Sequence, residues 1–69
     1  MKIGTFTAVL HREGNLYVAE CPEVGTVSQG ETIEAAIANL REATELYLEE
    51  FPMTDFERPF MTVFEATYA

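Results

Sequence analysis

The chain has 69 residues, of which 48% are hydrophobic and 23% are charged, so it can form a core and disorder is not expected. Its length predicts a single domain over residues 1–69, small enough for another chain to contribute to its stability. Twelve acidic and four basic residues give a net charge of −8. That charge disfavours direct nucleic-acid and membrane binding and attracts basic proteins, although it is also a common route to solubility.

The few metal-binding and redox-active residues limit the possible chemistry. Cys21 is the only cysteine, which excludes an internal disulfide, and a single histidine leaves no Cys/His cluster for a metal site. No stretch approaches the roughly 18 apolar residues that cross a bilayer, and the N-terminus has no long apolar signal core. We therefore expect a cytoplasmic protein with no metal, no cofactor and no membrane segment.

The first predicted element is a β-hairpin. Residues 3–10 alternate apolar and polar side chains and are rich in Thr, Phe and Val, which is typical of a strand. A Gly-Asn turn follows, and residues 16–20 (LYVAE) are again β-prone. Whether Ala8 faces Ala19 or Val18 stays open, because a slip of one residue exchanges the two faces of the second strand.

A third strand and a helix are predicted next. Pro22 and Gly25 favour a turn, which leads into a short edge strand over residues 26–29. Thr32 is suited to cap a helix that Pro52 ends. The apolar side chains of this helix recur at spacings of three and four and predict one face packed on the sheet: Ile33, Ala36, Ile37, Leu40, Thr44, Tyr47 and Phe51.

The last predicted element is a fourth strand over residues 59–68 (PFMTVFEATY), apolar on both faces. A strand–helix–strand crossover is usually parallel and right-handed, so this strand is expected beside the first. The prediction is an α+β fold of order βββαβ, with a four-stranded mixed sheet and one long helix on one face.

Catalysis is not predicted. A metal-dependent nuclease needs carboxylates that converge on metal ions, and the first strand has no acid in its interior. Glu20 and Glu23 flank a turn and Glu34 falls on the polar side of the helix, so these acids are interpreted as solvated surface. His11 lies near the hairpin turn with no nucleophile placed beside it, and Cys21 is interpreted as a small packing residue.

Several apolar residues are predicted to contact another chain. One helix covers one face of a sheet, and a C-terminal strand that is apolar on both faces invites association. We therefore expect a homo-oligomer, most simply a two-fold dimer, with Met61, Val63 and Phe64 in the contact. Leu46 lies away from the apolar face of the helix and is a further candidate contact.

The hairpin with GNLYVAE is followed by Pro22 and Gly25, and then by SQGET and EAAIANLREATELYLE, in that order. Through these motifs residues 5–51 resemble the HicB-like antitoxin family. The resemblance implies a truncated ribonuclease-H-like fold without catalysis, which in type II toxin–antitoxin pairs binds and masks HicA, a small basic RNA-cleaving toxin. Many members carry a C-terminal DNA-binding segment, whereas this sequence reaches Ala69 just after the fourth strand, so autorepression is not expected.

The leading hypothesis is thus a protein-binding module that shields a basic toxin through acidic and apolar contacts. The alternative is an oligomeric structural or ligand-sensing domain. A gene for a small basic toxin-like protein beside this one would favour the first.

Overall fold

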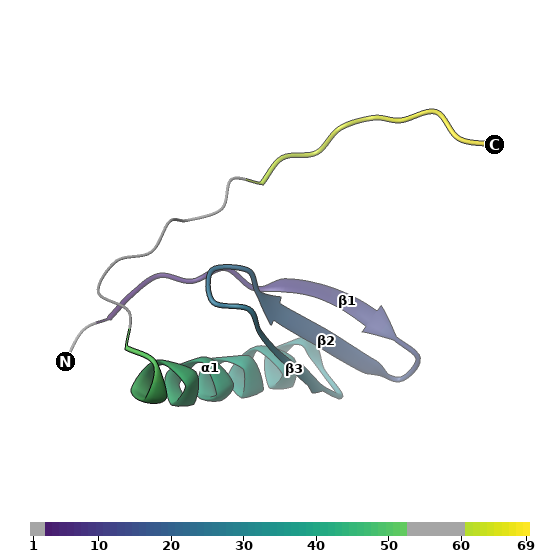
Figure 1. Cartoon of the computed structure of the whole chain (residues 1–69). Coiled ribbons are helices and arrows are strands. Elements are labelled where there is room, and N and C mark those ends of the chain that lie inside the picture. The colour runs from purple at the N-terminus through teal and green to yellow at the C-terminus, as the bar shows by residue number, and fades with distance from the viewer. Residues whose placement is uncertain (1–2, 53–60) are drawn as a thin grey trace.

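The computed structural model describes residues 3–52 and 61–69. Within these residues it is an α+β fold in which one helix lies against one face of an antiparallel sheet (Figure 1). The strand order is β1-β2-β3, so β2 is central. In chain order the elements are β1 (Val9–Glu13), β2 (Leu16–Cys21), β3 (Thr26–Gly30) and α1 (Ile33–Glu50).

The predicted hairpin is present, and its loop fixes the register. The loop consists of Gly14 and Asn15. Gly14 has φ +59°, whereas Asn15 does not have a positive φ, as expected for a two-residue turn in which glycine comes first. The register pairs Leu10 with Ala19, which is buried towards the helix, and places Val18 on the opposite face. Ala8 precedes β1 and therefore pairs with neither Ala19 nor Val18.

The helix begins and ends where the sequence predicts. The Thr32 hydroxyl accepts a 3.0 Å hydrogen bond from the Ala35 amide, which satisfies one of the unpaired amides of the first turn. Glu34 lies in that turn, where negative charge is favourable. The helix ends at Glu50, two residues before Pro52, because a proline disfavours helical geometry in the residue before it.

Apart from Leu40, the buried core between the sheet and α1 is made of small side chains within the described residues. Thr44 is a buried polar residue of α1, and its hydroxyl shares a 2.7 Å hydrogen bond with the hydroxyl of Thr26 on β3. Of the predicted apolar helix face, Ile33, Tyr47 and Phe51 are exposed near the helix ends. The buried hydrophobic residues of the described chain are Ala19, Cys21, Ala36 and Leu40.

Gly30 sets the distance between β3 and α1. A methyl group at this position would lie 2.5 Å from the Ala36 backbone nitrogen and 2.8 Å from the Ala35 carbonyl carbon, which is too close for non-bonded atoms. Asn39 fixes the same pair of elements, because its side-chain amide donates a 2.7 Å hydrogen bond to the Gln29 carbonyl. The first half of α1 is therefore held tightly against edge strand β3.

The first strand differs from its prediction. It is Val9–Glu13, whereas the side-chain alternation predicts residues 3–10. The physical reason lies at Thr7, whose backbone amide donates to both carboxylate oxygens of Glu23, at 3.0 and 3.1 Å. An amide bonded to a side chain is not available for a strand ladder.

The four-stranded mixed sheet and the order βββαβ are wrong. The described sheet has three strands, both pairings are antiparallel, and residues 61–69 form no strand. Residues 59 and 60 of the predicted fourth strand lie outside the described residues. β-propensity indicates that a segment suits a pleated, half-buried surface but does not say which surface receives it. The truncated ribonuclease-H-like arrangement includes that strand, so it is corrected to βββα.

The sheet face away from α1 mixes apolar and charged side chains. Val9 and Val27 are exposed there, on either side of Glu20, because the register pairs Glu20 with both of them. A glutamate between two valines interrupts the apolar surface. This face is therefore less suited to an apolar partner than the sequence alone suggests.

We predict that Gly30→Ala destabilises the domain by about 1–3 kcal/mol, the usual cost of overpacking. The added methyl group would force apart β3 and the backbone of Ala35 and Ala36. The matched control is Gly4→Ala, whose methyl group would meet only the Phe6 ring, at 3.0 Å. Urea unfolding of the three proteins measures the difference, and equal stability of the two variants would contradict this role of Gly30.

Candidate binding groove and acidic helix face

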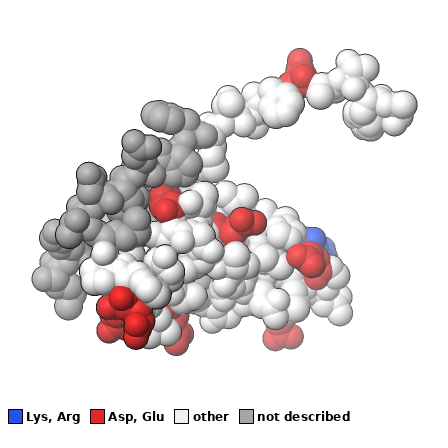
Figure 2. All heavy atoms as spheres, viewed as in Figure 1, with Lys and Arg blue, Asp and Glu red and all other residues white. Residues whose placement is uncertain are grey.

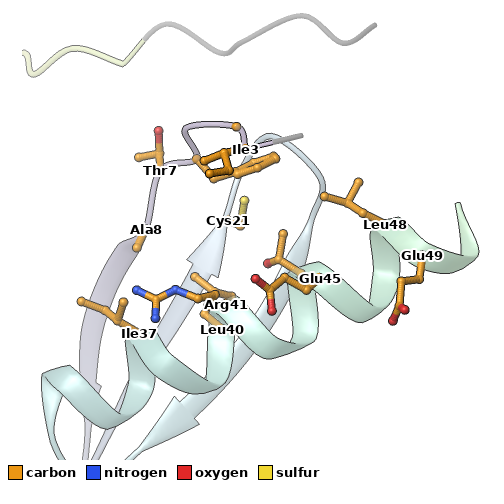
Figure 3. A pocket seen from close by; sticks show the side chains of 13 residues that line it. Ile3, Thr7, Ala8, Cys21, Ile37, Leu40, Arg41, Glu45, Leu48 and Glu49 are labelled. Atoms are coloured by element: carbon orange, nitrogen blue, oxygen red, sulfur yellow. The ribbon is translucent and has the colours of Figure 1, made fainter. Parts of the chain in front are cut away.

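A groove of about 830 Å³ lies between α1 and the residues that precede β1 (Figure 3). Its lining comes from residues 3–8, from the end of β2 and from one side of α1. Cys21 and Leu40, both buried, contribute to its apolar surface. A concave, mainly apolar site of this size with few polar groups suits an apolar ligand or peptide segment.

Glu23 holds the wall of the groove that residues 3–8 form. Its carboxylate accepts hydrogen bonds from the Thr7 hydroxyl at 2.7 Å, from the Thr7 amide and from the Cys21 thiol at 3.3 Å. Glu23 lies in the turn between β2 and β3, which closes with a 2.7 Å hydrogen bond from the Gly25 amide to the Cys21 carbonyl. Gly25 has φ +86°, a conformation that favours glycine.

The same hydrogen bonds set the acidity of Glu23. Desolvation raises the pKa of this carboxyl, but the bonds from the Thr7 hydroxyl and amide outweigh it and lower the pKa to about 2, from an ordinary 4.5. Glu23 is therefore ionised at neutral pH. Burial raises the pKa of the Cys21 thiol, and its hydrogen bond to Glu23 acts in the same direction. A protonated thiol is a weak nucleophile.

The helix forms the opposite wall. Ile37, Leu40 and Leu48 present apolar side chains to the groove, and Arg41 and Glu45 bring charges to it (Figure 3). At 100° per residue these five residues fall within about 140° of the helix circumference, so they share one side of the helix. Thr32 fixes the start of α1, and Gly30 fixes its contact with β3. Together they determine which side of the helix faces the groove.

An acidic stripe runs along α1 beside the groove; its residues are Glu34, Glu42, Glu45 and Glu49. At 100° per residue they fall within about 80° of the helix circumference, and all four are exposed. None forms an ion pair with another described residue. Figure 2 shows acidic groups gathered near the C-terminal end of α1, while Lys and Arg colour only one small area, at the hairpin end. Glu45 and Glu49 belong to both the stripe and the groove lining.

The four predicted contact residues do not form one site with the groove. Leu46 is 57% exposed on α1 and does not line the groove. Met61, Val63 and Phe64 are exposed in the segment that carries no helix or strand. Their role in a contact remains a prediction.

No sequence pattern predicts the groove. Glu23 is interpreted from sequence as a solvated surface acid, and this is wrong because it is half-buried and hydrogen-bonded. Its partner Thr7 lies 16 residues earlier, so no local pattern connects the two. Leu48 carries no special signal either, because an apolar helix residue beside a predicted core face is ordinary.

The acids considered for metal catalysis do not converge. Glu20 lies on the open sheet face and Glu34 in the first turn of α1, so they belong to different layers. His11 bonds to Glu13 at 2.8 Å on the exposed hairpin, away from the groove lining. Within the described part of the chain, no group of three His, Cys, Asp or Glu residues could hold a metal ion.

Comparison with protein-family models, curated proteins and solved structures found no match for this chain. Among the described residues, no helix has the length and apolar character needed to span a membrane. The groove, the acidic stripe and residues 61–69 are the features on which a function can be proposed.

We predict that Glu23→Gln lowers the free energy of unfolding by about 1.5–3 kcal/mol at pH 7, because it weakens hydrogen bonds to a charged acceptor. The folded pKa of about 2 lies below the ordinary 4.5, so this stabilisation is present above pH 4.5 and is lost as the pH falls towards 2. The difference in free energy of unfolding between wild type and Glu23→Gln should therefore become smaller over that range. Urea unfolding across the range measures it.

Glu20→Gln is the control for this experiment, because it also removes one carboxylate but from the open sheet face. If the difference in free energy of unfolding between wild type and Glu23→Gln stays constant from pH 7 to pH 2, the assigned hydrogen bonds are contradicted.

Proposed function

We propose that this chain is a non-catalytic protein-binding module of the HicB-like antitoxin type, which binds and neutralises a small basic RNA-cleaving toxin of the HicA type. The turn, cap and helix residues that resemble this family lie in the described βββα unit. The net charge of −8 favours a basic partner.

The observation that carries this proposal is the unpaired charge of the acidic stripe. Glu42, Glu45 and Glu49 lie three or four residues apart, where like charges destabilise a helix. Glu49 and Glu50 also lie in the last turn, where no basic residue offsets the negative end of the helix dipole. A cationic surface bound here would relieve both costs. Solubility alone does not require acids in these unfavourable positions.

The groove supports a second candidate, an oligomeric or ligand-sensing domain. Its apolar lining suits an uncharged ligand or segment better than a basic surface. The two candidates differ in salt dependence, because binding of a basic partner weakens as salt screens charges and apolar binding does not.

We predict that Glu42→Gln with Glu45→Gln weakens binding of a purified HicA-type toxin about tenfold at low salt. Two exposed ion pairs, each of about 0.7 kcal/mol, account for that factor. The probe is the product of the neighbouring gene, provided that it is a small basic protein of this type, and isothermal titration calorimetry at two salt concentrations is the measurement.

The matched control is Glu13→Gln with Glu20→Gln. It also removes two negative charges, but from the hairpin and the open sheet face. It should change affinity less than about threefold, because general charge acts weakly at a distance in salt. Equal losses for the two double variants would reject the acidic stripe as the contact, and no binding at all would reject the toxin proposal.

We also predict that the purified chain neither cleaves RNA nor binds DNA tightly. Its described acids do not converge on a metal position, and its charge repels phosphates. RNA incubation with and without Mg²⁺ or Mn²⁺, followed by gel analysis, tests this. Cleavage that is lost in Glu20→Gln or Glu34→Gln would overturn the non-catalytic assignment, whereas cleavage that both variants retain would indicate contamination.

A further inference from the structure

We infer that residues 61–69 of one copy of this chain lie in the groove of a second copy, so that two copies exchange these segments. The segment Met61 to Ala69 is hereafter the C-terminal segment. This inference does not depend on toxin binding, because it rests on an apolar contact in the groove and not on the charge of the acidic stripe.

The C-terminal segment has much exposed apolar surface. Phe64 and Tyr68 are 86% and 91% exposed, and the segment forms neither helix nor strand. It extends away from the sheet and helix (Figure 1). Exposed apolar surface concentrated in one short segment indicates that the segment binds another surface.

The groove matches this segment in length and character. Its helix wall runs from Ile37 to Glu49, which is about 18 Å at 1.5 Å per residue. In an extended chain, Phe64 and Tyr68 lie on the same side, about 13 Å apart at 3.3 Å per residue. Both rings therefore fit along the wall, next to the apolar residues Leu40 and Leu48 that line the groove.

The acid in the segment decides which side enters the groove. Alternation places Glu65 with Met61 and Val63, opposite Phe64 and Tyr68. Burying the Glu65 carboxylate against apolar side chains without a partner would be costly. We therefore assign Phe64 and Tyr68 to the groove, and Met61 and Val63 to its outer side.

A second copy is the occupant because each chain carries both halves of the contact. Its groove lies beside α1, while its C-terminal segment lies apart from that helix (Figure 1). Reciprocal exchange fills two grooves and covers two segments in one closed two-fold dimer. A small domain whose described residues include four buried hydrophobic ones gains much from such added burial.

The first test compares the two sides of the C-terminal segment by analytical ultracentrifugation of the full chain. Phe64→Ser and Tyr68→Ser should each raise the dimer dissociation constant about thirtyfold, as for a central interface residue. Met61→Ser with Val63→Ser should change it less than about threefold. These positions are exposed, so the variants should fold as wild type does by circular dichroism. A larger effect from the Met61 and Val63 pair would overturn the assignment of sides.

The second test pairs a groove variant with a control on the same helix. Leu48→Asp should abolish dimerisation, whereas Leu46→Asp, two residues away and outside the groove, should leave it intact. Leu48→Gln is the milder substitute that should still weaken the dimer measurably if Leu48→Asp reduces helix content. An equal loss in the Leu46 variant would reject the groove as the binding surface.

Mixing identifies whose segment fills the groove. Phe64→Ser retains an intact groove and Leu48→Asp retains an intact C-terminal segment. At concentrations where each variant alone is monomeric, an equimolar mixture should therefore form heterodimers. A monomeric wild type would mean that the groove holds its own segment or another protein's, and would overturn the inference.

Salt separates this inference from the proposed function. Two copies of charge −8 repel each other, so added salt should strengthen the exchange dimer and weaken binding of a basic toxin. A dimer with no toxin affinity would reject only the proposed function. Salt-sensitive toxin binding by a monomeric wild type would reject only the exchange.

Discussion

The close approach of β3 to the first turns of α1 is the constraint on which the rest of the structure depends. Gly30 permits it, because even a methyl group there would collide with the Ala36 backbone nitrogen. This close approach leaves room only for small side chains between β3 and α1, and Ala36 is fully buried there. Tight packing at one edge therefore determines a thin core, and a thin core buries few large hydrophobic side chains.

The groove is the other consequence of this geometry. With α1 held against β3, its opposite side faces residues 3–8, which do not continue the sheet. Glu23 secures those residues through Thr7 and Cys21, so one ionised carboxylate keeps the far wall in place. The Glu23 carboxylate can stay ionised in this position because three hydrogen-bond donors compensate its desolvation. The apolar space between the walls follows from these two fixed contacts.

Local signals made much of the fold predictable from sequence. The Gly-Asn loop, the Pro22–Gly25 turn, the Thr32 cap and the helix stop before Pro52 each involve neighbouring residues, and each lies where it was predicted. The errors concern distant partners. Residues 3–8 have the alternation of a strand, but Thr7 among them bonds to a carboxylate 16 residues away. Residues 61–69 are β-prone, but they have no strand partner among the described residues. The groove depends on such distant contacts, so no motif could predict it.

The two proposed contacts meet on α1, because Glu45 and Glu49 lie both in the acidic stripe and at the groove. Exchange of C-terminal segments would bring Glu65 of one copy, on the outer side of its segment, towards the acidic stripe of the other. Nearby like charges raise the electrostatic cost of the dimer and strengthen the attraction of the same surface for a cation. A basic partner would neutralise this added charge and so favour the exchanged dimer. By thermodynamic linkage the dimer would in turn bind that partner more tightly than a single copy does.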